Sequence, residues 1–378
     1  MAPPSPDPTG RADADMVRVL AALQASGAKP VSTLDVAQAR AQPTPGDAAA
    51  AVARQMGVAA KQDVAKVSDI TITGGATTLP ARVYYPMPPQ GGAMADGGQA
   101  GSGAMLSQVP APRPGQPVMP GALPVILYFH GGGWVTGTLD TYDASDRALA
   151  NGTGAIVVSV QYREGPENRF PAAQDDADTS YNWLLNNAAS MGGDPRRVAL
   201  AGESAGGNLA IDTAIWARDT HLPAPVAELL VYPVVGTDLT TPSYNETMNA
   251  VPLNQAAIGW YVSHFTSNPV DLQDPRLNVI GKAKLAGLPP TTIVSAEIDP
   301  LRSEGEAMGQ ALKAAGVDTE QRTFPGVTHE FFGMGAVVGQ AKLAEDFASA
   351  RLRAAFAQPV AAAPVAVRRG HHMRRLED

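Results

Sequence analysis

The sequence contains no cysteine among its 378 residues. It therefore has no disulfide framework, no thiol nucleophile, no iron–sulfur cluster and no zinc site built on thiolates. Positive charge is also scarce, because 28 Lys and Arg residues stand against 36 Asp and Glu residues, a net charge of −8. Such a chain offers no cationic field for phosphate backbones, so nucleic acid is not an expected partner.

Long apolar runs are missing as well. No stretch reaches the roughly 18 uninterrupted apolar residues that a membrane-spanning helix needs, so we expect no stable membrane insertion. The N-terminal stretch lacks the order of a basic start, an apolar middle and a small-residue cleavage site. We therefore expect a cytoplasmic protein, with export of a processed form left open. The oligomeric state is also left open between monomer and homodimer.

The composition is otherwise that of a globular protein, with 44% hydrophobic and 17% charged residues. The exception is the segment 87–121, which is rich in Gly and Pro and has no aromatic residue. This composition cannot bury enough apolar surface to fold alone. We interpret the segment as a disordered insertion, rather than a functional lid, because it offers no catalytic chemistry.

Short apolar runs alternate with helical patterns over most of the chain. An antiparallel pair is expected at 67–73 and 81–85. Runs typical of parallel strands buried on both faces follow at 124–130, 155–162, 197–201, 228–235 and 291–296, with a last strand at 319–324. Apolar residues three to four apart predict helices at 172–189, 205–218, 303–315 and 339–356. This order predicts an α/β fold, a mostly parallel sheet flanked by helices.

The strongest chemical signal is the sequence Gly202-Glu203-Ser204-Ala205-Gly206, which directly follows one predicted strand and opens the next helix. A serine at so sharp a strand-to-helix turn projects its hydroxyl above the edge of the sheet, and the small flanking residues let neighbouring chains approach. Ser204 is therefore the candidate nucleophile. The backbone N–H of Ala205, at the start of the helix, points toward the same space.

A second signal is the sequence His130-Gly131-Gly132-Gly133-Trp134 at the end of another predicted strand. Consecutive glycines leave backbone N–H groups unshielded, and such donors stabilise the oxyanion of an acyl-transfer intermediate. A phosphate-binding loop is the alternative, but neither a G-x-G-x-x-G nor a G-K-[ST] pattern follows. Here His130 is expected to brace the loop.

A serine hydroxyl needs a base at neutral pH. His329 is the candidate by elimination among six histidines, because it follows the last predicted strand, at the edge where Ser204 is expected. An imidazole in this role is oriented by a buried carboxylate. Two carboxylates follow the preceding strand, and we favour Asp299 over Glu297. The order serine, acid, histidine is the one expected of an α/β-hydrolase.

Together these motifs make the chain resemble the bacterial hormone-sensitive-lipase-like esterases of the α/β-hydrolase superfamily. The resemblance rests on the H-G-G-G-W loop, the Gly202–Ala210 segment, the sequence Asp299-Pro300-Leu301 and His329. It implies a helical cap over the acyl site. The implied division is an N-terminal cap segment at 1–60, a hydrolase core at 61–235 and 289–357, a second cap segment at 236–288 and a frayed tail at 358–378.

The resemblance further implies a serine carboxylesterase that acts on short to medium acyl esters through an acyl-enzyme, without metal or organic cofactor. The expected partner is a small-molecule ester. Family resemblance points to Gly132 and Gly133, with Ala205, as oxyanion donors, and Trp134 is a candidate for the substrate pocket or for packing. Two alternatives stay open: hydrolysis of amides, lactones or carbamates by the same triad, and a non-catalytic ligand-binding protein on this scaffold.

Overall fold

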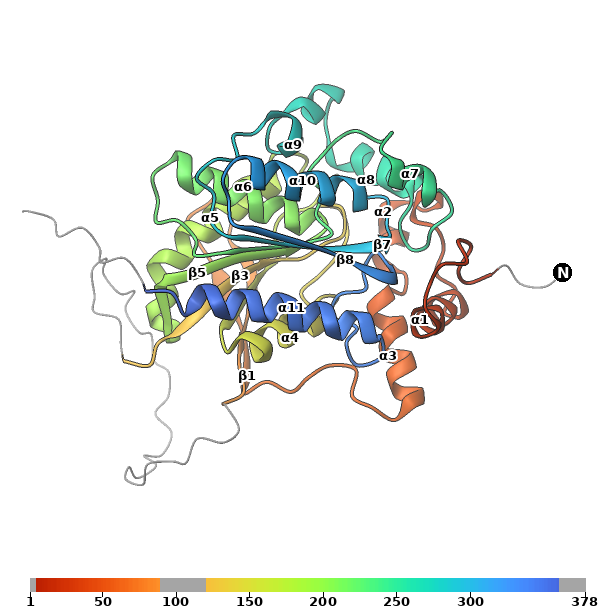
Figure 1. The fold of residues 1–378 in the computed structure, drawn as a ribbon, viewed down its shortest axis with the longest axis horizontal. Coiled ribbons are helices and arrows are strands. Elements are labelled where there is room, and N and C mark those ends of the chain that lie inside the picture. The colour runs from red at the N-terminus through yellow and green to blue at the C-terminus, as the bar shows by residue number, and fades with distance from the viewer. Residues whose placement is uncertain (1–4, 89–119, 360–378) are drawn as a thin grey trace, which may run out of the picture.

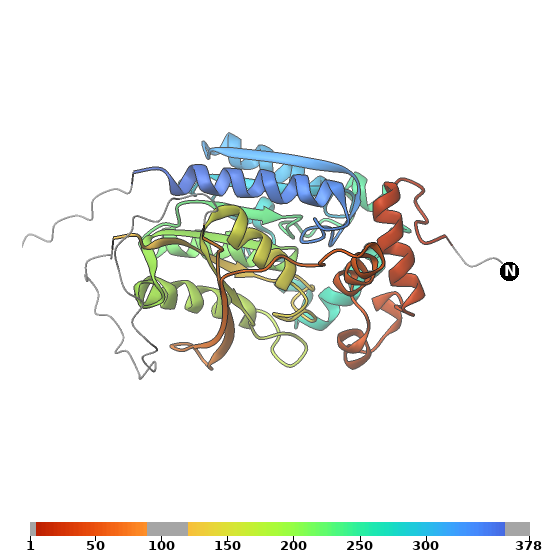
Figure 2. The same ribbon diagram turned by 90° about the horizontal axis from the view of Figure 1, so that it is seen from below.

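The computed structural model describes residues 5–88 and 120–359. Within these ranges the chain forms one eight-stranded sheet with helices on both faces (Figures 1 and 2). The strands are β1 (Lys66–Ile72), β2 (Leu79–Tyr85), β3 (Leu123–Phe129), β4 (Ile156–Val160), β5 (Gly193–Glu203), β6 (Glu228–Val231), β7 (Thr291–Ile298) and β8 (Thr319–Thr328). Most of the predicted insertion at 87–121 and of the predicted tail lies outside the described residues.

The α-helices in the described ranges are α1 (Ala14–Ala25), α2 (Val36–Ala41), α3 (Pro45–Met56), α4 (Asp143–Thr153), α5 (Ala172–Asn187), α6 (Ala205–Asp219), α7 (Pro242–Glu246), α8 (Gln255–Phe265), α9 (Val279–Lys282), α10 (Arg302–Ala314) and α11 (Gly339–Phe356). Short 3-10 helices are η1 (Val31–Thr33), η2 (Ala188–Met191) and η3 (Pro269–Gln273). None of the helices in this part of the chain is long and apolar enough to cross a bilayer.

The strand order is β1-β2-β4-β3-β5-β6-β7-β8. The pairs β1–β2 and β2–β4 are antiparallel, and all later neighbours are parallel. The inner strand β4 is buried along its whole length, as its nearly continuous apolar run predicts. The predicted mostly parallel sheet flanked by helices is thus confirmed, including the antiparallel opening pair.

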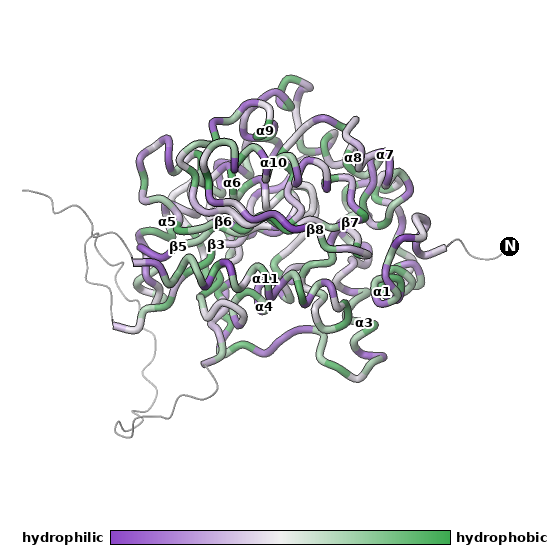
Figure 3. Tube along the Cα trace, in the orientation of Figure 1, coloured by the Kyte–Doolittle hydropathy of each residue, from purple (hydrophilic) through white to green (hydrophobic). Residues whose placement is uncertain are grey.

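Two apolar clusters fill the space between the sheet and its helices. One packs α5, α6 and α10 on one face, and the other packs α4 and α11 on the opposite face, together with α1 and α3. In Figure 1 α5, α6 and α10 lie above the sheet and α4 and α11 below it; in Figure 3 the inner strand β3 is mostly hydrophobic, whereas the edge strand β8 is largely hydrophilic. The helices α1 to α3 gather beyond one end of the sheet with α7 and α8 (Figure 1).

Two details of the sequence-based prediction were wrong. The predicted strand at 228–235 ends at Val231, because Tyr232 has a φ of +35° and Pro233 cannot donate to a ladder. Helix α4 was not predicted, since its buried side carries Asp143, Ser145 and Asp146 in addition to apolar residues. Because polar residues occupy part of its buried side, α4 lacks the clear spacing of apolar residues three to four apart by which the other helices were predicted.

Candidate active site

Ser204 lies at the turn between β5 and α6. Its backbone adopts φ +56° and ψ −117°, a conformation that side chains rarely take, and its N–H donates to the carbonyl of Val231 at 2.9 Å. A Cβ added at Gly202 would come within 3.0 Å of the Gly206 backbone, and one at Gly206 would collide with the carbonyl of Phe129. The two glycines of the motif are therefore required by close backbone approach, and they permit the strained turn.

The structure brings Ser204, His329 and Asp299 together from three strand ends. His329 follows β8 and places Nε2 3.0 Å from Ser204 Oγ, while its Nδ1 lies 2.7 Å from Asp299 Oδ2. The three residues are 5%, 3% and 0% exposed, respectively. The second oxygen of Asp299 accepts the N–H of Leu301 at 2.9 Å. This chain of contacts allows a hydroxyl proton to pass to Nε2 while Nδ1–H stays bound to a carboxylate.

The protonation of His329 is controlled by opposing effects. Burial by itself lowers the pKa of His329, but the charge of Asp299 and the hydrogen bond to it outweigh burial. The charges of Glu330 and Glu203 act in the same direction as Asp299, and the net pKa lies above the ordinary value of 6.5. The site therefore favours the imidazolium that forms when the base takes a proton.

Glu297, the alternative acid, does not contact the imidazole. Its carboxylate accepts from Arg11 at 2.9 Å and from the N–H of Gly326 at 2.8 Å. The Gly326 hydrogen bond and the Arg11 partner lower the pKa of Glu297. This carboxylate thus joins the N-terminal segment to the end of β8 before His329, and of the two candidate acids the structure places Asp299 next to the imidazole.

The glycine loop after β3 lies beside Ser204. Gly132 and Gly133 have φ values of +99° and +60°. Within the described residues, their N–H groups donate to no protein acceptor. The N–H of Ala205, in the first turn of α6, belongs to the positions that have no acceptor within the helix. Gly132 and Gly133 also line the cavity beside Ser204, so their N–H groups are placed to meet a ligand oxygen.

His130 lies beneath this loop and is fully buried. Its Nδ1 lies 2.8 Å from the carbonyl of Gly131, its Nε2 lies 3.2 Å from the amide nitrogen of Gln161, and its ring stacks on Tyr162 at 4.3 Å. The hydroxyl of Tyr162 donates to the His130 carbonyl at 2.9 Å. Burial lowers the pKa of His130 to about 4, so the ring is neutral at pH 7. These contacts brace the loop.

Gly132→Ala is expected to lower kcat/KM by about 10²-fold to 10³-fold, the loss typical of an impaired oxyanion site. The added Cβ would fall within 3.0 Å of the Thr136 backbone carbonyl and displace the loop. Gly154→Ala is the matched control, because Gly154 also has a positive φ of +72° but has nothing within 4 Å of the added Cβ. Esterase rates and melting temperatures of both variants separate collision from backbone strain. Equal activity in both variants would contradict the placement of the donors.

A cavity of about 730 Å³ opens over Ser204, His329 and the glycine loop. Its wall is mostly apolar and comes from segments far apart in sequence. The N-terminal part of the chain contributes Leu20, Leu23, Val31 and Ala39, and the region after β6 contributes Leu239, Tyr244, Leu253, Ile258, Tyr261 and Leu277. Both regions that the sequence assigns to a cap therefore line the cavity.

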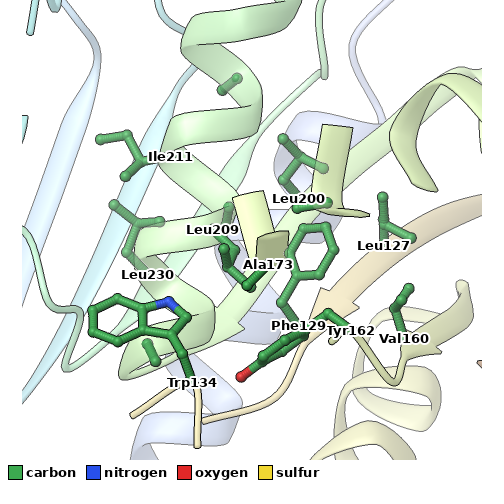
Figure 4. Packing of buried hydrophobic residues seen from close by; sticks show 14 of the residues in the cluster. Leu127, Phe129, Trp134, Val160, Tyr162, Ala173, Leu200, Leu209, Ile211 and Leu230 are labelled. Carbon is green, nitrogen blue, oxygen red and sulfur yellow. The ribbon is translucent and has the colours of Figure 1, made fainter. Parts of the chain in front are cut away.

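Trp134 lines the same cavity and is only 4% exposed. Its ring stacks on Phe265 of α8 at 4.5 Å between centroids. Figure 4 shows the indole among buried side chains of the core, including Leu230 and Leu209. The side chain of Trp134 thus both lines the pocket and packs in the core, which were the two roles considered for it from the sequence.

Several polar residues of the site were given no role by the sequence analysis. Glu203 is buried behind the triad, where it accepts hydrogen bonds from the hydroxyls of Tyr128 and Tyr232, and burial raises its pKa to about 7. Tyr232 packs on the His329 ring at 4.4 Å between centroids. Glu330 and Tyr142 line the cavity. The only available signal was adjacency, since Glu203 and Glu330 flank two of the predicted triad residues.

The described residues contain no cluster of three His, Cys, Asp or Glu side chains that is arranged to hold a metal ion.

Comparison with known proteins agrees with this geometry. Residues 126–333 match the family model described as the alpha/beta hydrolase fold. Carboxylesterase NlhH of Mycobacterium tuberculosis is 42% identical over 272 residues, covering 70% of this chain and 74% of that protein. Ethyl acetate hydrolase of Pseudomonas putida is 36% identical over 232 residues, covering 61% and 72%, respectively.

Among solved structures, LAE6, an alpha/beta hydrolase enzyme from the metagenome of Lake Arreo, aligns with a TM-score of 0.74 at 29% identity. That alignment covers 92% of this chain and 100% of LAE6. The family match spans more than half of the chain, and the carboxylesterase relative extends over more than two thirds of it. The chain is therefore an enzyme that belongs to the hormone-sensitive-lipase-like esterases of the α/β-hydrolase superfamily.

Proposed function

We propose that the chain hydrolyses short to medium acyl esters with Ser204 as nucleophile, His329 as general base and acid, and Asp299 as the orienting carboxylate. The observation that carries this proposal is the continuous contact from Ser204 Oγ to Nε2 at 3.0 Å and from Nδ1 to Asp299 at 2.7 Å. Related carboxylesterases with substantial identity support the same chemistry.

In the first half-reaction, Ser204 Oγ attacks the ester carbonyl carbon while His329 Nε2 takes the hydroxyl proton. The N–H groups of Gly132, Gly133 and Ala205 stabilise the negative oxygen of the tetrahedral intermediate. The carbon–oxygen bond to the alcohol then breaks, and Nε2 returns the proton to the departing oxygen. The alcohol leaves, and the acyl group stays on Ser204 as an ester.

In the second half-reaction, a water molecule attacks the acyl carbonyl and transfers a proton to Nε2. The second tetrahedral intermediate collapses, Ser204 recovers its proton from Nε2, and the carboxylic acid is released. Throughout both steps Asp299 keeps Nδ1–H in place and stabilises the imidazolium.

The segments 1–60 and 236–288 act in this proposal as a two-part cap that limits the acyl chain. Apolar side chains from both segments line the cavity, and helix α8 contacts the N-terminal region directly, because Trp260 Nε1 donates to the carbonyl of Leu34 at 2.9 Å. The small-molecule ester is the partner of this site. Location in the cytoplasm and a monomeric or homodimeric state stay predictions.

The test is kcat/KM for p-nitrophenyl esters from acetate to dodecanoate. A cavity of about 730 Å³ with an apolar wall is expected to give a maximum among short to medium chains and a decline toward dodecanoate. Parallel assays with p-nitroanilides of the same acids measure the preference for an ester leaving group. A folded protein that cleaves no ester, or one that cleaves anilides faster, would contradict the proposal.

A further inference from the structure

The residue that follows the triad histidine combines two unusual properties. Glu330 has a φ of +69°, in the left-handed region where glycine is favoured and side chains are disfavoured. The residue nevertheless lines the cavity that contains Ser204 and His329. A strained conformation held next to reacting atoms points to a use for the side chain that a glycine at this position would lack.

The carboxylate of Glu330 has one hydrogen-bonding partner in the described part of the chain, the hydroxyl of Tyr142. This hydroxyl lies 2.8 Å from Oε1 and 3.0 Å from Oε2. Tyr142 immediately precedes α4 and is only 4% exposed. The partner is therefore itself fixed by packing, and it holds the carboxylate in one place.

Tyr142 also supports the loop of the oxyanion donors. A Cβ added at Gly131 would collide with the Tyr142 hydroxyl, so the phenol lies directly against the backbone of this glycine. The phenol ring also stacks on His130 at 5.8 Å between centroids. Since Glu330 is covalently next to His329, the Tyr142 hydrogen bond joins the loop of the general base to the loop that binds the oxyanion.

The carboxylate also acts on the imidazole through its charge. Burial, together with the charge of Asp299, raises the pKa of Glu330, the charge of His329 and the Tyr142 hydrogen bond lower it, and the net pKa lies above the usual value. In return, the charge of Glu330 contributes to the raised pKa of His329, after the larger effects of burial and Asp299. In its ionised form, Glu330 is thus a second negative group beside the imidazolium that forms during the reaction.

We propose that Glu330 is a positioning residue. Its carboxylate accepts the hydrogen bond of Tyr142 and so holds the His329 loop in a fixed position relative to the glycine loop that carries the oxyanion donors. The same carboxylate stabilises the imidazolium. The inference rests on the proposed triad mechanism. Nucleophile, base and oxyanion donors come from three separate loops, and small displacements among such groups reduce the rate of the chemical step. The Tyr142–Glu330 hydrogen bond is therefore expected to affect kcat more than KM.

The ionisable groups around this pair are two carboxylates and four tyrosines. The ionisable residues that contact His329 or interact electrostatically with it or with Glu330 are Asp299, Glu203, Tyr142, Tyr162, Tyr232 and Tyr261. None of these groups is cationic, so His329 is the one group in this set that becomes positively charged during the reaction. Removal of a carboxylate from this set is therefore expected to lower the pKa of the imidazole.

Three variants separate the effect of the Glu330 charge from the effect of the Tyr142–Glu330 hydrogen bond. Glu330→Gln keeps a hydrogen-bond acceptor for Tyr142 and removes the charge, so kcat is expected to stay within about threefold of wild type while the acidic limb of the pH profile moves to lower pH. Tyr142→Phe removes the hydrogen bond to Glu330 and keeps the carboxylate. For this variant kcat is expected to fall about tenfold, and the acidic limb of the pH profile is not expected to move to lower pH. Glu330→Gly suits the backbone and removes both, so it is expected to show both effects.

Tyr181→Phe is the matched control for the loss of a buried phenol hydroxyl. Tyr181 donates to the carbonyl of Pro223 at 2.6 Å and is not among the residues that line the cavity. Rates are normalised to active sites titrated with a p-nitrophenyl phosphonate, and melting temperatures are recorded, so that partial unfolding is not counted as slow catalysis. The control is expected to keep both the wild-type kcat and the wild-type pH profile.

The inference is overturned if Glu330→Gly and Tyr142→Phe lose thermal stability but keep wild-type kcat per titrated site and the same acidic limb. If either of these variants fails to fold, Glu330→Gln decides through its pH profile, because an unmoved limb overturns the role of the charge. Failure of the proposed function is distinct from these results, since the wild-type enzyme would then release no p-nitrophenol and would not be titrated.

Discussion

Ser204→Ala is expected to lower kcat for p-nitrophenyl butyrate by about 10⁵-fold to 10⁶-fold, the scale of nucleophile removal from a serine triad. Without Oγ no acyl-enzyme forms, and His329 Nε2 loses the hydroxyl that lies 3.0 Å away. The oxyanion donors and the cavity stay in place, so a small residual rate above that of water is expected. The measurement is steady-state kcat together with a burst assay, which detects the acyl-enzyme directly.

The matched control is Ser180→Ala. The Ser180 hydroxyl is also buried, but it donates to the carbonyl of Asp176 within α5. This variant is expected to keep the wild-type kcat with at most a modest loss of stability, about 1 kcal/mol for one hydrogen bond. A Ser204→Ala protein that is folded and still shows a burst would mean that another residue is acylated, which would contradict the assignment.

Asp299→Asn is expected to lower kcat by about 10⁴-fold, because an amide in place of the carboxylate favours the wrong tautomer of the triad imidazole. The structure makes this effect specific, since Asp299 Oδ2 lies 2.7 Å from Nδ1 and the residue is fully buried. The loss of the negative charge also lowers the pKa of His329, so the acidic limb of any residual activity moves to lower pH. Stopped-time assays at high enzyme concentration measure the residual rate.

Glu297→Gln is the control for Asp299→Asn, two residues away on the same strand end. Its side chain contacts Arg11 and Gly326 instead of the imidazole. The Arg11–Glu297 pair is about one third exposed on each side, so its loss is expected to cost at most about 1 kcal/mol of stability. We expect a wild-type kcat in this variant. A large loss in Glu297→Gln with little loss in Asp299→Asn would identify Glu297 as the acid.

The local sequence pattern predicted those helices and strands in which the apolar residues are buried and the polar residues are exposed. Strand β4 is apolar except for Ser159 and buried throughout, and it was found from the sequence to within two residues. Helix α4 was not found, because its inner side buries the polar residues Asp143 and Asp146. Asp143 pairs with Arg147 in the same helix and also with Lys61, which lies far away in the chain. A window of neighbouring residues does not contain such a distant partner.

The residues of the candidate site also differ in how far the local sequence predicts them. Ser204 lies in a motif whose glycines are needed at one turn, so the local sequence predicts it. His329 and Asp299 followed from chain order and from positions after strands, but the choice between Asp299 and Glu297 needed the contact itself. Glu297 is the penultimate residue of β7 and Asp299 directly follows the strand, and alternation along a strand would place residues two apart on the same face, so only the folded structure separates them.

The sequence by itself determined the nucleophile turn, the glycine loop, the strand-and-helix order and the family, because each of these depends on residues close together in the chain. Only the tertiary structure decided which acid faces His329, how two distant segments close one cavity, and that Tyr142 joins Glu330 to the oxyanion loop. These features are contacts between residues far apart in the chain, such as Tyr142 and Glu330, and such contacts exist only after the chain has packed.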